Sequence, residues 1–182
     1  MYRINGGNKL SFLLRAQKNI FTTADLAVLW GIENDNTLWT TVKRYVALGK
    51  LYKLRKGLYA KRPVSELSKY EIGCALMGSN SYISLESVLA QSGVIMQVIS
   101  QVTLVGAKSA KVEIEGTTYV CKKAKEDVLF NRLGVNEYQG YSVATPERAV
   151  ADIQFWKPKY YLDNPAGFNL QKVEEIKREV NY

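Results

Sequence analysis

The sequence contains no histidine, only two cysteines and no long apolar run. Without histidine the chain cannot build a Ser-His-Asp or Cys-His catalytic device, and it lacks the commonest zinc ligand. Cys74 and Cys121 do not form a CxxC pair, and their apolar surroundings favour reduced, buried thiols. No apolar stretch approaches the roughly 18 residues that a membrane span needs. Residues 1–8 are polar and glycine-rich, unlike a signal peptide, so we expect a cytoplasmic protein that makes no membrane contact.

Acidic residues are scarce in the first third of the chain. Residues 1–62 carry 12 lysines and arginines against three acids, a net charge of +9. Residues 63–182 carry 13 bases and 14 acids, a net charge of −1. So sharp an asymmetry indicates that one end of the protein faces a polyanion. We therefore expect two domains, 1–62 and 63–182, with different roles.

Three helices are expected in the basic segment. Each is indicated by apolar residues at helical spacing after a residue that can cap a helix. The helices run from Asn8 or Ser11 to Gln17, from Thr22 or Thr23 to Gly31, and from Thr37 to Leu48, with Asp35 or Asn36 capping the third.

The third helix is the candidate for reading DNA. Its apolar stripe comprises Leu38, Val42, and Tyr45 or Val46, and the opposite face combines short hydroxyls with long bases. Such a face can approach a phosphate backbone and still reach base edges. The candidate contacts are Asn36, Thr37, Thr40, Thr41, Lys43 and Arg44.

A basic hairpin follows that helix. Two β-prone runs within residues 51–62 flank Arg55-Lys56-Gly57, where glycine supplies the positive φ of a tight turn. Its outward bases are expected to be Lys53, Arg55, Lys56, Lys61 and Arg62. Taken alone the hairpin could be a solvated face, but three helices and a basic hairpin in this order predict a winged helix-turn-helix over residues 1–62.

The neutral segment predicts a mixed α/β domain, which makes the fold class α+β. Alternating and β-branched runs predict strands of a small antiparallel sheet. The expected strands are 98–105, 111–115 and 117–122, with further extended pieces at 128–130 and 138–143. The expected helices are 65–77, one capped at Ser84 and ending near Ser92, 145–156 capped by Thr145, and 169–180, whose apolar stripe is Leu170, Val173, Ile176 and Val180.

No catalytic or metal constellation is evident in the neutral segment. Glu113 and Glu115 share one strand face, which a solvated sheet edge explains. Asp127, Glu137 and Asp152 lack the accompanying pattern of a metal nuclease. We expect no enzyme, no metal and no cofactor. The last helix is expected to cover the core, although docking of a partner stays open.

Three stretches in order resemble a known family. They are residues 48–59 in the hairpin region, the segment Tyr-Ile-Ser-Leu-Glu-Ser-Val-Leu at 82–89, and Ala-Thr-Pro-Glu-Arg-Ala at 144–149. Together they are similar to the AbiEi-type antitoxins of type IV toxin–antitoxin (abortive infection) systems. The resemblance covers roughly residues 20 to 155.

The resemblance implies a DNA-binding transcriptional regulator that represses its own promoter. It also implies an antitoxin domain that counteracts a cognate nucleotidyltransferase toxin without forming a stable complex. Double-stranded DNA and that toxin are the expected partners, and a homodimer on DNA stays open. The alternatives are a nucleic-acid-processing enzyme and an RNA-binding adaptor, each using the basic domain for delivery.

Overall fold

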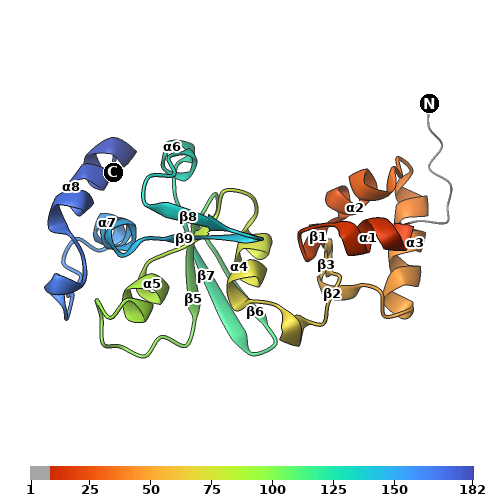
Figure 1. Ribbon diagram of the computed structural model, residues 1–182, viewed down its shortest axis with the longest axis horizontal. Coiled ribbons are helices and arrows are strands. Elements are labelled where there is room, and N and C mark those ends of the chain that lie inside the picture. The colour runs from red at the N-terminus through yellow and green to blue at the C-terminus, as the bar shows by residue number, and fades with distance from the viewer. Residues whose placement is uncertain (1–8) are drawn as a thin grey trace. The chain divides into compact units, whose positions relative to one another are not determined.

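A computed structural model describes residues 9–182 of the chain (Figure 1). The fold is α+β and divides into two compact units. Unit 1 ends at Ser68 and unit 2 spans Lys69–Tyr182, whereas the sequence placed the division between Arg62 and Pro63. The predicted cap Asn8 and the polar start at 1–8 lie outside the described residues.

Unit 1 combines three α-helices with a three-stranded antiparallel sheet of order β1-β3-β2 (Figure 1). The predicted hairpin is confirmed, with Gly57 at a φ of 82° in its turn. The strand β1 was not predicted, because three residues are too short for a periodic signal. The elements are α1 (Lys9–Arg15), β1 (Ile20–Thr22), α2 (Thr23–Trp30), α3 (Asp35–Ala47), β2 (Tyr52–Arg55) and β3 (Leu58–Ala60).

The start of α2 follows directly from its sequence. The Thr22 side chain accepts a hydrogen bond from the Asp25 amide, and the Asp25 carboxylate accepts one from the Thr22 amide at 2.7 Å, which completes a capping box. Phe21 before the cap and Leu26 at the fourth helical position both join the buried apolar cluster. That cluster packs the three helices against the sheet. It consists of Leu13, Phe21, Leu26, Trp30, Leu38, Val42, Tyr45, Leu51 and Tyr59.

The helix α3 begins two residues earlier than predicted. Asn34, not Asp35 or Asn36, is the cap: its backbone is extended and its side chain accepts a hydrogen bond from the Thr37 amide at 3.0 Å. Asp35 and Asn36 are already helical. Four capping-type residues stand in a row here, and only the tertiary path of the chain selects one of them. Gly49, at a φ of 64°, follows the helix end as expected.

Unit 2 is built on a six-stranded mixed sheet of order β6-β7-β5-β4-β9-β8. The sheet is larger than predicted and is not purely antiparallel: β6 and β7 pair antiparallel as expected, but β5 pairs with β7 in parallel and β4 pairs with β9 in parallel. The β6–β7 hairpin turns so that its second strand, not its first, lies against β5. The strands are β4 (Tyr82–Ile83), β5 (Val102–Gly106), β6 (Ala110–Ile114), β7 (Thr117–Lys123), β8 (Val135–Tyr138) and β9 (Tyr141–Ala144).

Several elements after the basic hairpin differ from the predicted ones in their ends or in their type. The helix expected over 65–77 is a short 3-10 turn, η1 (Val64–Glu66), then an extended Leu67 and α4 (Lys69–Met77). The strand expected from Val98 begins at Val102, and the extended piece at 128–130 belongs to α6 (Glu126–Phe130). The helix α5 (Glu86–Gln91) is preceded by Leu85 at a φ of 58°, so Ser84 is not its cap.

The last two long helices form largely as predicted. In α7 (Pro146–Trp156) the Thr145 side chain accepts a hydrogen bond from the Arg148 amide, and α8 (Leu170–Val180) is capped by Asn169. Leu170 is 63% exposed and does not belong to the buried stripe of α8. The helix α7 contacts both α5 and α8. Among residues 9–182, none of the helices has the length and apolar character needed to cross a bilayer.

Candidate nucleic-acid interface

The outer face of α3 is polar, basic and open. Asn36, Thr37, Thr40, Lys43 and Arg44 are all exposed. A shallow pocket of about 320 Å³ lies along this face, lined by Asn36, Thr37, Thr40, Thr41 and Arg44. Five of the six predicted α3 contacts are therefore accessible to a ligand.

Thr41 is the exception and corrects the prediction. Thr41 is only 7% exposed, because it lies on the inward stripe of α3 with Leu38, Val42 and Tyr45. Its hydroxyl donates a hydrogen bond to the Thr37 carbonyl at 2.8 Å, so the hydroxyl is satisfied within the helix. By its position in the helix, Thr41 lies at the border between the two faces of α3. Packing of α3 against the apolar cluster buries its side chain.

The two cations of α3 are available to a ligand. Neither Lys43 nor Arg44 makes an ion pair with any residue in the described range 9–182. The Arg44 guanidinium lies 5.8 Å from the centre of the Tyr45 ring, whose body is buried in the cluster. This cation–π contact holds Arg44 near the surface without neutralising its charge.

Hydrogen bonds connect the turn of the basic hairpin to the first residue of α2. The Thr23 amide donates to the Gly57 carbonyl at 3.1 Å, and the Thr23 hydroxyl reaches the same carbonyl at 3.3 Å. A side chain at Gly57 would meet the Thr23 hydroxyl, and the positive φ would add strain. Thr23 therefore positions the hairpin, whereas the sequence predicted it only as a possible helix cap.

The hairpin bases do not all face outward. Lys53, Lys56 and Arg62 are exposed, whereas Arg55 is half-buried. Lys61 is half-buried too, and its ammonium donates a hydrogen bond to the Ala16 carbonyl just after α1. A cation is favourable at a helix C-terminus, so the expectation that Lys61 faces outward is wrong.

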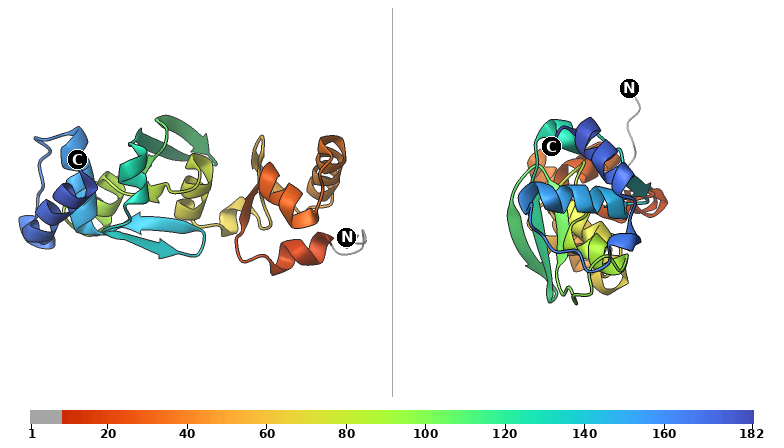
Figure 2. Two further views of the ribbon diagram at one scale, coloured as in Figure 1. Left: turned by 90° about the horizontal axis from the view of Figure 1, so that it is seen from above. Right: turned by 90° about the vertical axis from the view of Figure 1, so that its left-hand side faces the viewer.

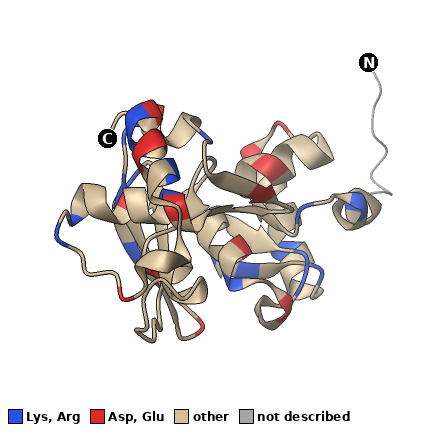
Figure 3. Ribbon diagram, turned by 60° about the vertical axis from the view of Figure 1, so that its left-hand side comes forward, with Lys and Arg blue, Asp and Glu red and all other residues tan. Residues whose placement is uncertain are grey.

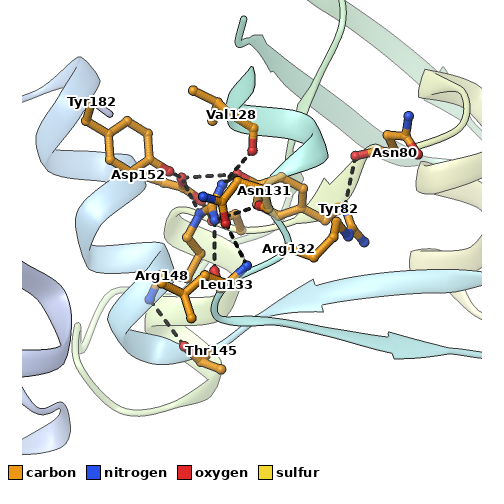
Figure 4. A network of polar contacts seen from close by, with 11 residues as sticks. Asn80, Tyr82, Val128, Asn131, Arg132, Leu133, Thr145, Arg148, Asp152 and Tyr182 are labelled. Carbon is orange, nitrogen blue, oxygen red and sulfur yellow. Dashed lines mark hydrogen bonds and ion pairs between the residues drawn. The ribbon is translucent and has the colours of Figure 1, made fainter. Parts of the chain in front are cut away.

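Unit 2 contains a buried polar network centred on an arginine (Figure 4). Arg148, which has no exposure, uses every N–H of its guanidinium. It donates to the Asp152 carboxylate at 3.2 Å and to the Tyr82 hydroxyl at 2.8 Å. Its remaining acceptors are the carbonyls of Val128, Asn131 and Leu133, all within 3.1 Å.

The partner of Arg148 is equally enclosed. Asp152 also has no exposure and accepts hydrogen bonds from the hydroxyls of Tyr82, Ser84 and Tyr182. Burial raises the pKa of Asp152, although Arg148 and the hydroxyl donors act to lower it. Every donor of Arg148 is paired and hydrogen-bond donors surround the Asp152 carboxylate, so the network connects separate elements of unit 2.

The two cysteines are poor nucleophiles. Cys74 and Cys121 are free thiols and both are buried, as predicted. Burial raises the pKa of the Cys121 thiol to about 11 and also raises the pKa of Cys74. Within residues 9–182, no three His, Cys, Asp or Glu side chains lie together as a metal site would require.

Charge on unit 2 is mixed in sign. In Figure 3 the ribbon of α8 carries basic and acidic residues next to one another. Lys177 pairs with Glu174 at 2.7 Å, and Arg178 pairs with Glu179 at 3.4 Å. Paired surface charges of both signs do not make a polyanion site.

Comparisons with known proteins support only the fold. No protein-family model matches the chain, and no curated protein matches it. Among solved structures, it is similar to the crystal structure of the RV2827C protein from Mycobacterium tuberculosis, with a TM-score of 0.52 and 13% sequence identity. The match covers 93% of this chain and 69% of that one, so the likeness extends over both units.

Proposed function

We propose that unit 1 is a winged helix-turn-helix that binds double-stranded DNA. In this proposal α3 enters the major groove and the β2–β3 hairpin is the wing over adjacent phosphates. The observation that carries the proposal is the open face of α3, where the exposed cations Lys43 and Arg44 stand beside small polar side chains. The net charge of +9 over residues 1–62 supplies the attraction to a polyanion.

The residues of α3 suit distinct parts of a duplex. Asn36, Thr37 and Thr40 are short and lie in the first half of the helix, where recognition helices approach base edges. Arg44 is long enough to reach a guanine edge and donate two hydrogen bonds there. Lys53, Lys56 and Arg62 are exposed and suit phosphate contact, which positions the protein without reading sequence.

We further propose that the chain is a transcriptional autorepressor and antitoxin of a type IV toxin–antitoxin system. Unit 2 would counteract a nucleotidyltransferase toxin in the cytoplasm without a stable complex. The support is the resemblance of residues 82–89 and 144–149 to AbiEi-type antitoxins. These two stretches meet in the network of Tyr82, Ser84 and Arg148, so the motif residues form one structural unit.

The DNA proposal is tested by anisotropy with a duplex from the promoter of this gene and a scrambled duplex. R44A is expected to lower the preference for the promoter about tenfold, since an arginine–guanine contact contributes on the order of 1–3 kcal/mol of discrimination. The control is R178A, an exposed arginine of unit 2. Equal loss on both duplexes would assign Arg44 to the backbone. Tighter binding to single-stranded RNA of the same sequence would favour the RNA adaptor instead.

The antitoxin proposal is tested by co-expression with a nucleotidyltransferase encoded beside this gene. The toxin is placed under a foreign promoter, so that repression cannot protect the cells. The full chain and its R44A variant are expected to allow growth, whereas R148M, which breaks the network of unit 2, is expected not to. Poisoning in the presence of the native chain would refute the antitoxin role and leave the DNA proposal intact.

A further inference from the structure

The outer edge of the unit 2 sheet has the pattern of a self-pairing strand. The strand β6 ends the strand order, so one of its sides has no neighbouring strand among residues 9–182. In both views of Figure 2 the green β6–β7 hairpin lies at the rim of unit 2. Its register with β7 is regular over all five residues, without a bulge or proline that would discourage pairing.

The turn after β6 determines which backbone groups point outward. Ile114 pairs with Thr117 across a two-residue turn, in which Glu115 and Gly116 have φ values of 44° and 76°. In such a hairpin the closing pair exchanges hydrogen bonds and every second pair repeats this. The alternation turns the N–H and C=O groups of Lys111 and Glu113 away from β7, toward the open side.

The side chains of the same two residues are complementary charges. Lys111 and Glu113 share one sheet face, both are exposed, and neither has an ion-pair partner within the described part of the chain. The other face of β6 is apolar, with half-buried Ala110, Val112 and Ile114. One face thus offers charges of opposite sign and the other an apolar row.

We propose that β6 pairs with β6 of a second copy of this chain, antiparallel, about a two-fold axis at Val112. In this register Lys111 of each copy faces Glu113 of the other. Both residues present outward backbone groups, so each of these pairs can exchange two hydrogen bonds. The interface is isologous, as closed dimers require.

Charge selects this register over its neighbours. Shifting the axis to Lys111 places two lysines opposite each other, and shifting it to Glu113 places two glutamates opposite each other. A shift to an axis between residues pairs outward backbone groups with inward ones, which forms no ladder. The other sheet edge, β8, lacks such a pattern, because its Glu137 already pairs with Arg132 at 3.5 Å.

Sedimentation of the full chain without DNA tests the proposal. A five-residue strand pair is a small interface, so we expect a weak dimer with a dissociation constant that is roughly micromolar. K111E and E113K each place like charges opposite each other at both pairs, and each is expected to weaken the dimer at least about tenfold. The control is E137K on β8, which is expected to dimerise like the native chain.

The decisive measurement combines the two variants. A 1:1 mixture of K111E and E113K is expected to restore the dimer as a heterodimer, and the double variant K111E/E113K is expected to restore it as a homodimer. Restoration also shows that neither variant is unfolded. A native chain that stays monomeric up to about 300 µM, far above a micromolar dissociation constant, would overturn the proposal. Single variants that dimerise like the native chain, or mixtures that stay monomeric, would overturn it too.

Discussion

The two units of this protein use charge in opposite ways. Unit 1 surrounds an apolar cluster with cations, and Lys43 and Arg44 on α3 stay exposed without an ion pair among residues 9–182. Unit 2 places Arg148 and Asp152 inside, both with no exposure, and satisfies them with hydroxyls and carbonyls. The exposed cations of α3 are available to a ligand, whereas the buried cation Arg148 of unit 2 is bound within the fold.

This difference determines which substitutions destabilise each unit most. An apolar cluster tolerates small changes of shape, because its contacts are many and individually weak. A buried ion pair depends on each partner, because removing one leaves the other charged or polar and unpaired. Unit 2 should therefore fail sharply at single polar residues, and unit 1 should fail at its large apolar ones.

The largest effect is expected for R148M. The substitution leaves the Asp152 carboxylate and three carbonyls without their donor, which costs about 3–5 kcal/mol of unfolding free energy. Trp156 reports on unit 2, and Trp30 and Trp39 report on unit 1. In urea titrations we expect the Trp156 transition to move to lower urea and the unit 1 transition to stay.

R178A is the control for R148M, since Arg178 lies on the surface of α8. It should leave both transitions in place. A parallel shift of both transitions in R148M would instead show that the two units unfold as one body.

The second largest effect is expected for a substitution in the apolar cluster of unit 1, which should destabilise unit 1 and leave unit 2 unchanged. L26A removes a side chain with no exposure from the middle of that cluster. We expect a loss of about 2–5 kcal/mol, seen in the transition of Trp30 and Trp39 and in a loss of DNA binding. V28A on the exposed side of α2, where Val28 is 84% exposed, should change neither. A shift of the Trp156 transition in L26A would contradict the independence of the units.

A third prediction concerns the basic hairpin. K53A/K56A removes two exposed cations, so the slope of log K against log salt should become shallower by about 1.8, at roughly 0.9 per phosphate contact. Binding to promoter and scrambled duplexes should weaken equally. K122A/K123A is the matched control, because it removes two exposed lysines from unit 2. An unchanged slope in K53A/K56A would show that the hairpin does not contact phosphate.

The smallest effect is expected at the cap of α2. Burial acts to raise the pKa of Asp25, but hydrogen bonds from Lys18 and Thr22 outweigh it, and the pKa lies below its usual value of 3.8. A carboxyl with a lowered folded-state pKa stabilises the fold above its unfolded-state pKa, and this contribution is lost as pH falls through the folded-state value.

D25N should therefore cost about 1 kcal/mol at pH 7, and the difference from the native chain should shrink as the pH falls below 3.8. Chemical unfolding of unit 1 at several pH values measures it. E33Q, at an exposed acid of the same unit, is the control. A difference that stays constant down to acid pH would mean that the charge of Asp25 is not what stabilises the cap.

Local features were predictable from the sequence alone. The cap Thr145, the cap Thr22 (one of the two expected candidates) and the turn at Gly57 form as expected, because each depends on residues within a few positions. The burial of both cysteines and most of the exposed face of α3 also follow from local periodicity. So does the contrast in charge between the two ends of the chain, which is a property of composition.

Long-range pairing decided the rest. Alternation predicts that β5 and β7 are strands but not that they run in parallel, since direction depends on which strands become neighbours. Thr41 and Lys61 turn inward because the cluster and the end of α1 lie there. Arg148 reads as an ordinary surface residue of a capped helix until the tertiary structure brings Tyr82, Asp152 and three carbonyls around it. Those acceptors offset the desolvation cost of the buried guanidinium, because every one of its donors has a hydrogen-bond partner.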